Sequence, residues 1–220
     1  MKKIDIVYED KEIIVVNKKS GLLCISTSKG EELTLYRMVS SYVKKSNPKL
    51  KVYIVHRLDK ETSGIVVFAK NKNSKLILQN NWDKMVKKRG YVAIVEGNVE
   101  KEKGTIKSYL KETKTLFVYS TKEKVGKLAI TKYRKVFGSN RYSLLDIEIK
   151  TGRKNQIRVH MKDIGHVIVG DKKYGSNVNP IRRMCLHANV LEFMHPKTKE
   201  LMHFEVDIPD GFIKIISNNS

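Results

Sequence analysis

The segment of residues 56–64 places one carboxylate among cations and hydroxyl groups, and it reads His-Arg-Leu-Asp-Lys-Glu-Thr-Ser-Gly. Asp59 has Arg57 and Lys60 beside it in the chain, and the segment closes at Gly64, a residue type common in turns. A carboxylate can serve as a nucleophile. An aspartate in a loop can also do no more than cap a turn, so the segment by itself leaves both interpretations open.

A second segment, residues 151–161, is dense in hydrogen-bond donors and reads Thr-Gly-Arg-Lys-Asn-Gln-Ile-Arg-Val-His-Met. Such a composition is typical of a site for an anionic ligand. Gln156 and Arg158 lie two positions apart, so on a helix their side chains diverge and only a subset can face one site. A solvated basic helix is the alternative interpretation of this segment taken alone.

The surrounding apolar patterns predict the elements that hold these two segments. Alternating or β-branched runs indicate strands, and apolar residues at helical spacing indicate helices. We expect strands at 4–8, 12–17, 52–55, 64–69, 91–95, 105–110, 116–120, 128–137, 142–149, 186–193 and 202–208, and helices at 33–43, 71–85 and 155–164. Strands outnumber helices and do not alternate with them. This predicts an α+β fold with a mixed, largely antiparallel central sheet and flanking helices, not a doubly wound parallel sheet.

The overall composition limits the class of protein. The 220 residues include 44 Lys and Arg but only 23 Asp and Glu, a formal charge of +21, which favours a polyanionic partner such as RNA. We expect one domain over 1–220, because no linker or repeat interrupts it, and a monomer. No apolar run could span a bilayer, and acidic residues interrupt the apolar stretch that export would need, so we expect a cytoplasmic protein.

Cysteine and histidine spacing gives no support for a metal site. Cys24 and Cys185 each lie in an apolar run, which indicates two buried, reduced thiols, and the six histidines show no pairing typical of zinc ligands. We therefore expect no metal and no cofactor.

Together the two polar segments resemble the RluA-type family of RNA pseudouridine synthases. Residues 56–64 carry the family's signature, and further segments that resemble it follow in the family's order at 10–21, 91–97, 151–160, 165–175, 183–188 and 195–196. The resemblance covers essentially the whole chain. It departs from the family pattern at Lys19 and Val167, where proline is usual, and at Asn155, where histidine is common. These departures concern loop shape and substrate choice, and they leave the reaction class unchanged.

The resemblance implies a pseudouridine synthase fold with an active-site cleft, and isomerisation of specific uridines in ribosomal or transfer RNA to pseudouridine. It implies that Asp59 is the catalytic nucleophile, that Arg158 pairs with it, and that Tyr91 stacks on the uracil. Arg57 would fill the space of the flipped nucleotide or hold its phosphate. For RNA binding we expect contributions from His56, Arg57, Thr62, Arg153 and Gln156. Some relatives carry a small N-terminal RNA-binding domain, which we expect this protein to lack.

Two other functions fit parts of these observations. A non-catalytic RNA-binding or ribosome-assembly factor could keep the same fold, but it has no use for a carboxylate in a groove for an anionic ligand. A metal-dependent nuclease would need a cluster of acidic ligands, which the sequence lacks. The sequence does not identify the RNA, the uridine position or the chemical route that the carboxylate follows.

Overall fold

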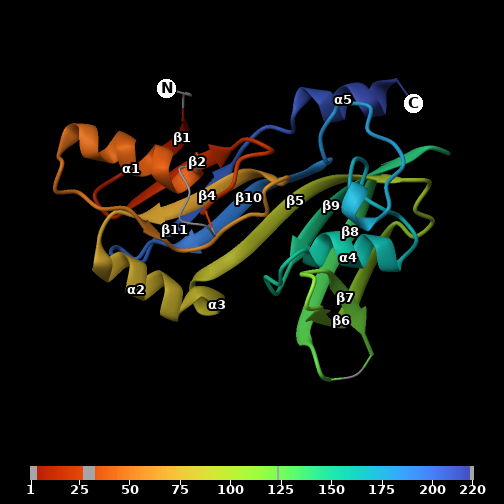
Figure 1. Cartoon of the computed structure of the whole chain (residues 1–220), viewed down its shortest axis with the longest axis horizontal. Helices are drawn as coiled ribbons and strands as arrows, with labels where there is room; N and C mark the ends of the chain where they lie inside the picture. Colours follow the sequence, from red (N-terminus) through yellow and green to blue (C-terminus); the bar gives the residue numbers. More distant parts are fainter. Residues whose placement is uncertain (1–3, 27–32, 123, 219–220) are drawn as a thin grey trace. The chain divides into compact units, whose positions relative to one another are not determined.

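The structure is a computed structural model that describes residues 4–26, 33–122 and 124–218 (Figure 1). The chain forms two compact units. Unit 1 comprises Met1–Lys87 and Ala188–Val206, and unit 2 comprises Lys88–His187 and Asp207–Ser220. Each unit therefore combines segments that lie far apart in the sequence. The expectation of a single domain over 1–220 stays a prediction.

Unit 1 contains an antiparallel set of strands that flanks the signature segment. Its strands are β1 (Asp5–Glu9), β2 (Ile13–Lys18), β3 (Tyr53–Ile54), β4 (Ser63–Ala69), β10 (Leu186–Met194, of which the first two residues belong to unit 2) and β11 (Leu201–Glu205). The order is β1-β2-β4-β10, with β11 on β10 and β3 on β4. The pairs β1–β2, β2–β4, β3–β4 and β10–β11 are all antiparallel.

The strands β2 and β4 are buried on both faces, which explains their unbroken apolar sequences. All of β4 is buried, and so are the first four residues of β2. The helices of unit 1 are α1 (Leu35–Ser46), α2 (Lys72–Asn80) and α3 (Trp82–Met85), of which Figure 1 shows α1 and α2 on either side of these strands. Thr34 and Asn71 cap α1 and α2 by accepting a hydrogen bond from the backbone N–H three residues on.

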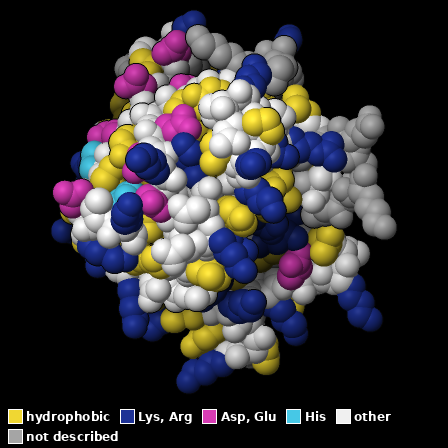
Figure 2. Space-filling model, turned by 90° about the vertical axis from the view of Figure 1, so that its left-hand side faces the viewer, with side chains coloured by type: hydrophobic (Ala, Val, Ile, Leu, Met, Phe, Trp, Pro, Cys, Tyr) yellow, Lys and Arg dark blue, Asp and Glu magenta, His cyan; other side chains and the backbone are white. Residues whose placement is uncertain are grey.

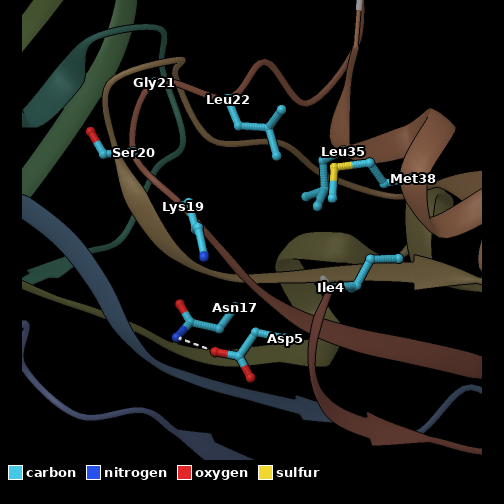
Figure 3. Close-up of a pocket in the computed structure, with 9 residues that line it drawn as sticks. All are labelled: Ile4, Asp5, Asn17, Lys19, Ser20, Gly21, Leu22, Leu35 and Met38. Carbon is cyan, nitrogen blue, oxygen red and sulfur yellow. Dashed lines mark hydrogen bonds between the residues drawn. The ribbon is translucent and has the colours of Figure 1, made fainter. Parts of the chain in front are cut away.

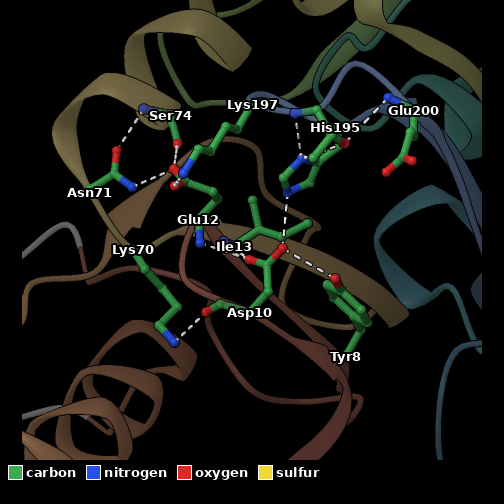
Figure 4. A network of polar contacts seen from close by, with 11 residues as sticks. Tyr8, Asp10, Glu12, Ile13, Lys70, Asn71, Ser74, His195, Lys197 and Glu200 are labelled. Atoms are coloured by element: carbon green, nitrogen blue, oxygen red, sulfur yellow. Dashed lines mark hydrogen bonds and ion pairs between the residues drawn. The ribbon is translucent and has the colours of Figure 1, made fainter.

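A polar network at one end of β2 joins distant parts of unit 1 (Figure 4). Asp10 accepts hydrogen bonds from the backbone N–H groups of Glu12 and Ile13, both at 2.7 Å. His195 Nε2 lies 3.0 Å from the other carboxylate oxygen of Asp10, and the His195 Nδ1 accepts from the Thr198 backbone N–H. Two segments that resemble the family pattern, 10–21 and 195–196, therefore meet in this network.

Unit 2 contains a second antiparallel set of strands. They are β5 (Val86–Glu96, of which the first two residues belong to unit 1), β6 (Lys103–Glu112), β7 (Val118–Thr121), β8 (Lys127–Gly138) and β9 (Tyr142–Ile149). Their order is β5-β9-β8-β6-β7, and each neighbouring pair is antiparallel. Its helices are α4 (Gln156–Asp163), the short 3-10 helix η1 (Lys172–Tyr174) and α5 (Asp210–Ser217).

The helix α4 packs on one face of these strands. Ile157 and Met161 join the main apolar core of unit 2, together with Leu145 and Ile147 of β9. Val159 instead joins a smaller cluster that contains residues of β6, β7 and β8. Both sides of α4 are therefore buried, and its polar residues must find partners inside the protein.

The predicted α+β class with a largely antiparallel sheet is confirmed. The expected helix at 71–85 is divided, because Asn81 leaves the helical conformation (φ −120°, ψ 20°) and separates α2 from α3. Strand β5 begins five residues earlier than the expected start at 91, and η1 and α5 were not expected. Among the described residues, no helix has the length and apolar character needed to cross a bilayer.

Candidate active site

The signature segment forms the loop between β3 and β4 in unit 1, and neighbouring groups hold its backbone in place. Asp59 is half-buried, and its carbonyl oxygen accepts a hydrogen bond from the Thr62 N–H at 3.2 Å. The Leu58 N–H donates to the sulfur of Cys24 at 3.4 Å, and His56 Nε2 accepts from the Val67 N–H at 3.0 Å. The loop therefore presents Asp59 from a supported backbone.

The ammonium group of Lys18 is the centre of this support. Lys18 is the last residue of β2 and only 1% exposed. Its Nζ donates hydrogen bonds to the carbonyl oxygens of Leu22 at 2.8 Å, Lys60 at 3.0 Å and Lys19 at 3.1 Å. A buried cation is costly unless its donors are used, and here three carbonyl groups use them. Because Lys60 follows Asp59, this cation links β2 directly to the loop.

A hollow of about 240 Å³ lies beside the same part of unit 1 (Figure 3). Lys19, Ser20 and Gly21 belong to its lining. The Gly21 N–H donates to the Lys60 carbonyl at 2.9 Å, and the Ser20 hydroxyl donates to the Glu61 carbonyl at 2.6 Å. Lys19, which stands where the family usually has proline, is exposed and extends into the hollow in Figure 3, so the change leaves the loop contacts of its neighbours in place.

The pKa of the Cys24 thiol reflects the charges around the signature loop, including that of Asp59. Burial raises the pKa of the Cys24 thiol, and the negative charge of Asp59 raises it further, whereas Lys18 and Arg57 act in the opposite direction. Lys18, Arg57 and Asp59 therefore each lie near enough to Cys24 for their charges to act on its thiol.

In unit 2, the guanidinium group of Arg158 is held by a buried carboxylate. Its Nε and Nη2 donate to the two oxygens of Asp171, at 2.7 Å and 2.6 Å, and its Nη1 donates to the Asn155 Oδ1 at 3.1 Å. Arg158 is 7% exposed and Asp171 is 2% exposed. The ring of Tyr174 lies under the guanidinium, with its centroid 4.9 Å from Cζ. These hydrogen bonds use three of the five N–H groups of the guanidinium.

Asn155 has a backbone conformation that explains its residue type. Its φ is +54°, in the left-handed region, where Asn, Asp and His are enriched among non-glycine residues. Its Nδ2 donates to the Tyr174 hydroxyl at 3.1 Å. The departure from the histidine common in the family therefore keeps a residue suited to this backbone. Val167, the third departure, packs against the small apolar cluster of unit 2.

The residues predicted to bind RNA differ in exposure. Arg57 and Arg153 are exposed, whereas His56 is half-buried against Trp82 and Thr62 is 2% exposed. Gln156 is 3% exposed, and both ends of its amide form hydrogen bonds inside the protein. Its Oε1 accepts from the Thr151 hydroxyl and the Arg153 N–H. Its Nε2 donates to the Ile130 carbonyl and the Thr131 hydroxyl.

Tyr91 lies on β5 in unit 2, opposite Ile147 of β9. It is half-buried and packs against the main apolar core of that unit. Ile147 and Ile157 of α4 belong to the same core. Tyr91 therefore shares the core of unit 2 with the helix that carries Arg158.

Two residues of this site were not predicted. Lys18 and Asp171 lie within segments quoted for the resemblance, 10–21 and 165–175, but no role was assigned to either. The signal for Lys18 was a lysine that ends a run of buried apolar residues. The signal for Asp171 was an aspartate after a glycine, which fits its second role as the cap that accepts from the Tyr174 N–H.

Lys and Arg side chains outnumber acidic ones on the face that Figure 2 shows, in keeping with the formal charge of +21. Across 4–26, 33–122 and 124–218, no group of three or more His, Cys, Asp or Glu side chains is arranged to hold a metal ion. The expectation of a metal-free protein stays a prediction.

Comparison with known proteins places these features in one family. Residues 12–163 match the family model described as RNA pseudouridylate synthase. An uncharacterised RNA pseudouridine synthase of Bacillus subtilis is 37% identical over 213 residues, which cover 94% of this chain and 69% of that protein. The ribosomal large subunit pseudouridine synthase D of Borreliella burgdorferi is 34% identical over 223 residues, covering 98% of this chain and 68% of that protein.

A solved structure, human RNA pseudouridylate synthase domain containing 4, has a TM-score of 0.78 with 21% identity and covers 95% of this chain and 90% of its own. This likeness supports the fold alone.

The chain belongs to the RNA pseudouridylate synthase family. It is an isomerase that converts uridine in RNA to pseudouridine, and the RluA-type resemblance is confirmed. The matches support this activity over that of a non-catalytic binding factor.

Proposed function

We propose that Asp59 supplies the catalytic carboxylate of this enzyme. The observation that carries the proposal is the support of the signature loop: Lys18 and Gly21 both donate to the carbonyl of Lys60, beside a half-buried Asp59. A reactive group gains most when its position is set before the substrate arrives. One Lys18 hydrogen bond reaches the loop at Lys60, and the other two hold the neighbouring carbonyls of Lys19 and Leu22.

The reaction itself defines what the residues must do. The bond from uracil N1 to the ribose C1′ breaks, the base turns, and a bond forms from C5 to C1′. The proton on C5 is lost and N1 gains one, so the product is an isomer of the substrate. No external donor takes part in this balance. Asp59 acts on the ribose or the base while the two are separated, and its charged form is the reactive one.

We assign Tyr91 and Arg158 to this reaction by their resemblance to the family. Tyr91 stacks on the uracil and assists movement of the C5 proton. Arg158 orients Asp59 with a guanidinium that Asp171 and Asn155 hold in place. A planar guanidinium can contact two carboxylates at once, so the bond to Asp171 is compatible with this role and gives Arg158 a rigid base.

For RNA contacts we favour the exposed cations Arg57 and Arg153. His56, Thr62 and Gln156, which were also expected to bind RNA, contribute through the shape of the two polar segments. The substrate is a uridine in a loop or bulge of ribosomal or transfer RNA, because such a base can leave its stack at little cost. Relatives named as ribosomal large subunit and tRNA pseudouridine synthases support both classes of RNA. We propose that the enzyme acts in the cytoplasm, as a monomer and without a metal or cofactor.

The test is Asp59→Asn, with Asp83→Asn as a matched control on the exposed surface of α3. We expect Asp59→Asn to abolish pseudouridine formation while RNA affinity is retained, because the carboxylate acts in chemistry and repels phosphate. Asp83→Asn should leave both unchanged. Pseudouridine content and binding are measured on the same RNA. Full activity of Asp59→Asn would remove Asp59 from this role.

The RNA is identified by mapping pseudouridines in ribosomal and transfer RNA from cells with and without the gene. Positions that lose the modification, and regain it when the wild-type gene but not Asp59→Asn is returned, are the substrates. A loss confined to transfer RNA would exclude a ribosomal substrate.

A further inference from the structure

A second concavity, of about 420 Å³, lies wholly within unit 2. Its lining comes from the end of β6, the start of β7, the turn before β8 and the segment 152–154 that leads into α4. Only Arg153 of this lining was expected to contact RNA. We refer to this concavity as the β6–β8 pocket.

The base of the β6–β8 pocket is apolar. Leu110 of β6 pairs with Lys127 of β8, and Val118 of β7 pairs with Glu112 of β6. Paired residues point to the same face of a sheet, so all four side chains lie on one face. Leu110 and Val118 are 5% and 3% exposed and pack with Val159 of α4, which places this face on the α4 side.

The rim of the pocket is charged and its walls are held by the protein. The Arg153 Nε donates to the Leu128 carbonyl at 2.9 Å, which ties the segment before α4 to β8. Lys154 forms an ion pair with Glu112. A Cβ at position 126 would lie 2.7 Å from the Leu110 carbonyl oxygen, so only glycine lets this turn pack against β6. The pocket is therefore formed without a ligand.

The charge balance of the lining suits a polyanion. Lys127, Arg153 and Lys154 contribute three cations, and among the described lining residues Glu112 alone carries a carboxylate. Lys111 lies one position from Leu110 on β6, so its side chain points to the opposite face. Lys127 forms no ion pair with any residue of the described ranges. Cations that neutralise phosphates release counterions and so favour binding.

We propose that the β6–β8 pocket binds the sugar–phosphate backbone of the RNA substrate. Lys127, Arg153 and Lys154 contact phosphate groups. The inference rests on the proposed function for the identity of the ligand, and it adds a binding site outside the signature loop.

The test compares two double variants that remove the same charge from unit 2. Lys127→Ala/Lys154→Ala removes two cations from the rim. Lys103→Ala/Lys132→Ala removes two exposed cations from the opposite face of β6 and β8. Lys103 and Thr105 each lie an odd number of positions from Leu110 on β6, so their side chains point away from the pocket. Lys132 pairs with Thr105 and points the same way. The probe is a fluorescent RNA stem–loop with uridines in the loop, and binding is measured over a series of KCl concentrations.

The logarithm of the RNA association constant falls linearly with the logarithm of the salt concentration. We expect the pocket variant to reduce the magnitude of this slope by about 1.4, which corresponds to the loss of two single-strand phosphate contacts. The opposite-face variant should change the slope by less than half of that. An unchanged slope in the pocket variant, or an equal fall in both variants, would overturn the proposal, since only general charge would then be involved.

Glu112→Gln tests the same site with the opposite sign and guards against misfolding of the double variant. It removes the only carboxylate among the lining residues that the structure describes, and it releases Lys154. We expect tighter binding by roughly threefold at fixed salt, from the loss of one repulsive charge near the rim. Unchanged or weaker binding by Glu112→Gln contradicts the proposal.

Binding is measured without turnover, which separates this inference from the proposed function. Pseudouridine formation by the wild-type protein is followed on RNA from cells that lack the gene. Absence of product there would contradict the proposed function alone. Equal binding by the wild-type and pocket variants would contradict the pocket alone.

Discussion

The guanidinium of Arg158 and the carboxylate of Asp171 form a buried, two-point ion pair, with N–O distances of 2.7 Å and 2.6 Å. The residues are 13 positions apart and belong to α4 and to the cap of η1. Both the charge and the planar fork of arginine are needed for such a contact. The pair therefore fixes the orientation of Arg158 from within unit 2.

Arg158→Lys should lower the single-turnover rate by about 10²-fold at saturating enzyme, because lysine keeps the charge but loses the planar fork that orients its partners. The salt slope of RNA binding should change little, since few phosphate contacts are lost. The matched control is Arg134→Lys, an exposed arginine that pairs with Asp146. A near-normal rate with a reduced salt slope in Arg158→Lys would show an ordinary phosphate contact instead.

Lys18→Met should loosen the loop that carries Asp59. The carbonyls of Lys19, Leu22 and Lys60 each lose the Lys18 donor, and Lys60 keeps the Gly21 N–H. With this support reduced, the amides of Gly21 and Thr62 should exchange hydrogen faster than in the wild type, while amides in the core of β4 keep their protection. Turnover should fall at saturating RNA, with affinity nearly unchanged. Lys44→Met, an exposed lysine at the end of α1, is the control. Wild-type exchange at Gly21 and Thr62 would exclude this role for Lys18.

Gly64→Ala should destabilise the protein more than Gly21→Ala. Both glycines have positive φ, +118° and +80°, so both variants strain the backbone. At Gly64 the new Cβ would also lie 2.1 Å from the Ala188 carbonyl oxygen, whereas nothing lies within 4 Å at Gly21. We expect Gly64→Ala to lower the free energy of unfolding by about 2 kcal/mol more than Gly21→Ala. Chemical denaturation measures both, and equal losses would show that the contact relaxes.

Stability should fall on acidification, partly through His160. Burial lowers the pKa of His160 from its usual 6.5 to about 4, and its two ring nitrogens lie within hydrogen-bond distance of the Thr131 and Ser108 hydroxyls. Between pH 6.5 and about 4 the unfolded chain binds a proton that the folded protein excludes. The stabilisation is therefore complete above pH 6.5 and is lost as the pH falls toward 4, by up to about 1.4 kcal/mol per pH unit.

In His160→Gln this contribution disappears, so the free energy of unfolding should depend less steeply on pH over that window. His187, whose pKa burial also lowers to about 4, remains and keeps part of the slope. His203→Gln, at an exposed position of β11, is the control. An unchanged slope in His160→Gln would mean that His160 is not excluded from protonation in the folded protein.

Much of this protein is encoded in local patterns. The apolar runs at 12–17 and 64–69 predicted β2 and β4 because strands buried on both faces leave no polar positions. The signature at 56–64 pointed to Asp59 through its resemblance to the family, and the catalytic role of Asp59 stays a prediction. The helix at 71–85 was predicted as one piece, because apolar spacing continues through Asn81 and does not report the local break there.

Only the tertiary structure decided which groups the polar residues contact. Lys18 reaches Lys60 across 42 positions, and His195 reaches Asp10 across 185 positions. The sequence contains many carboxylates that could pair with Arg158, and none of its local patterns selects Asp171. Strand and helix formation depend on hydrogen bonds and burial between near neighbours in the chain, so sequence patterns report them. Buried polar contacts depend on which distant segments pack together, and this is determined when the whole unit folds.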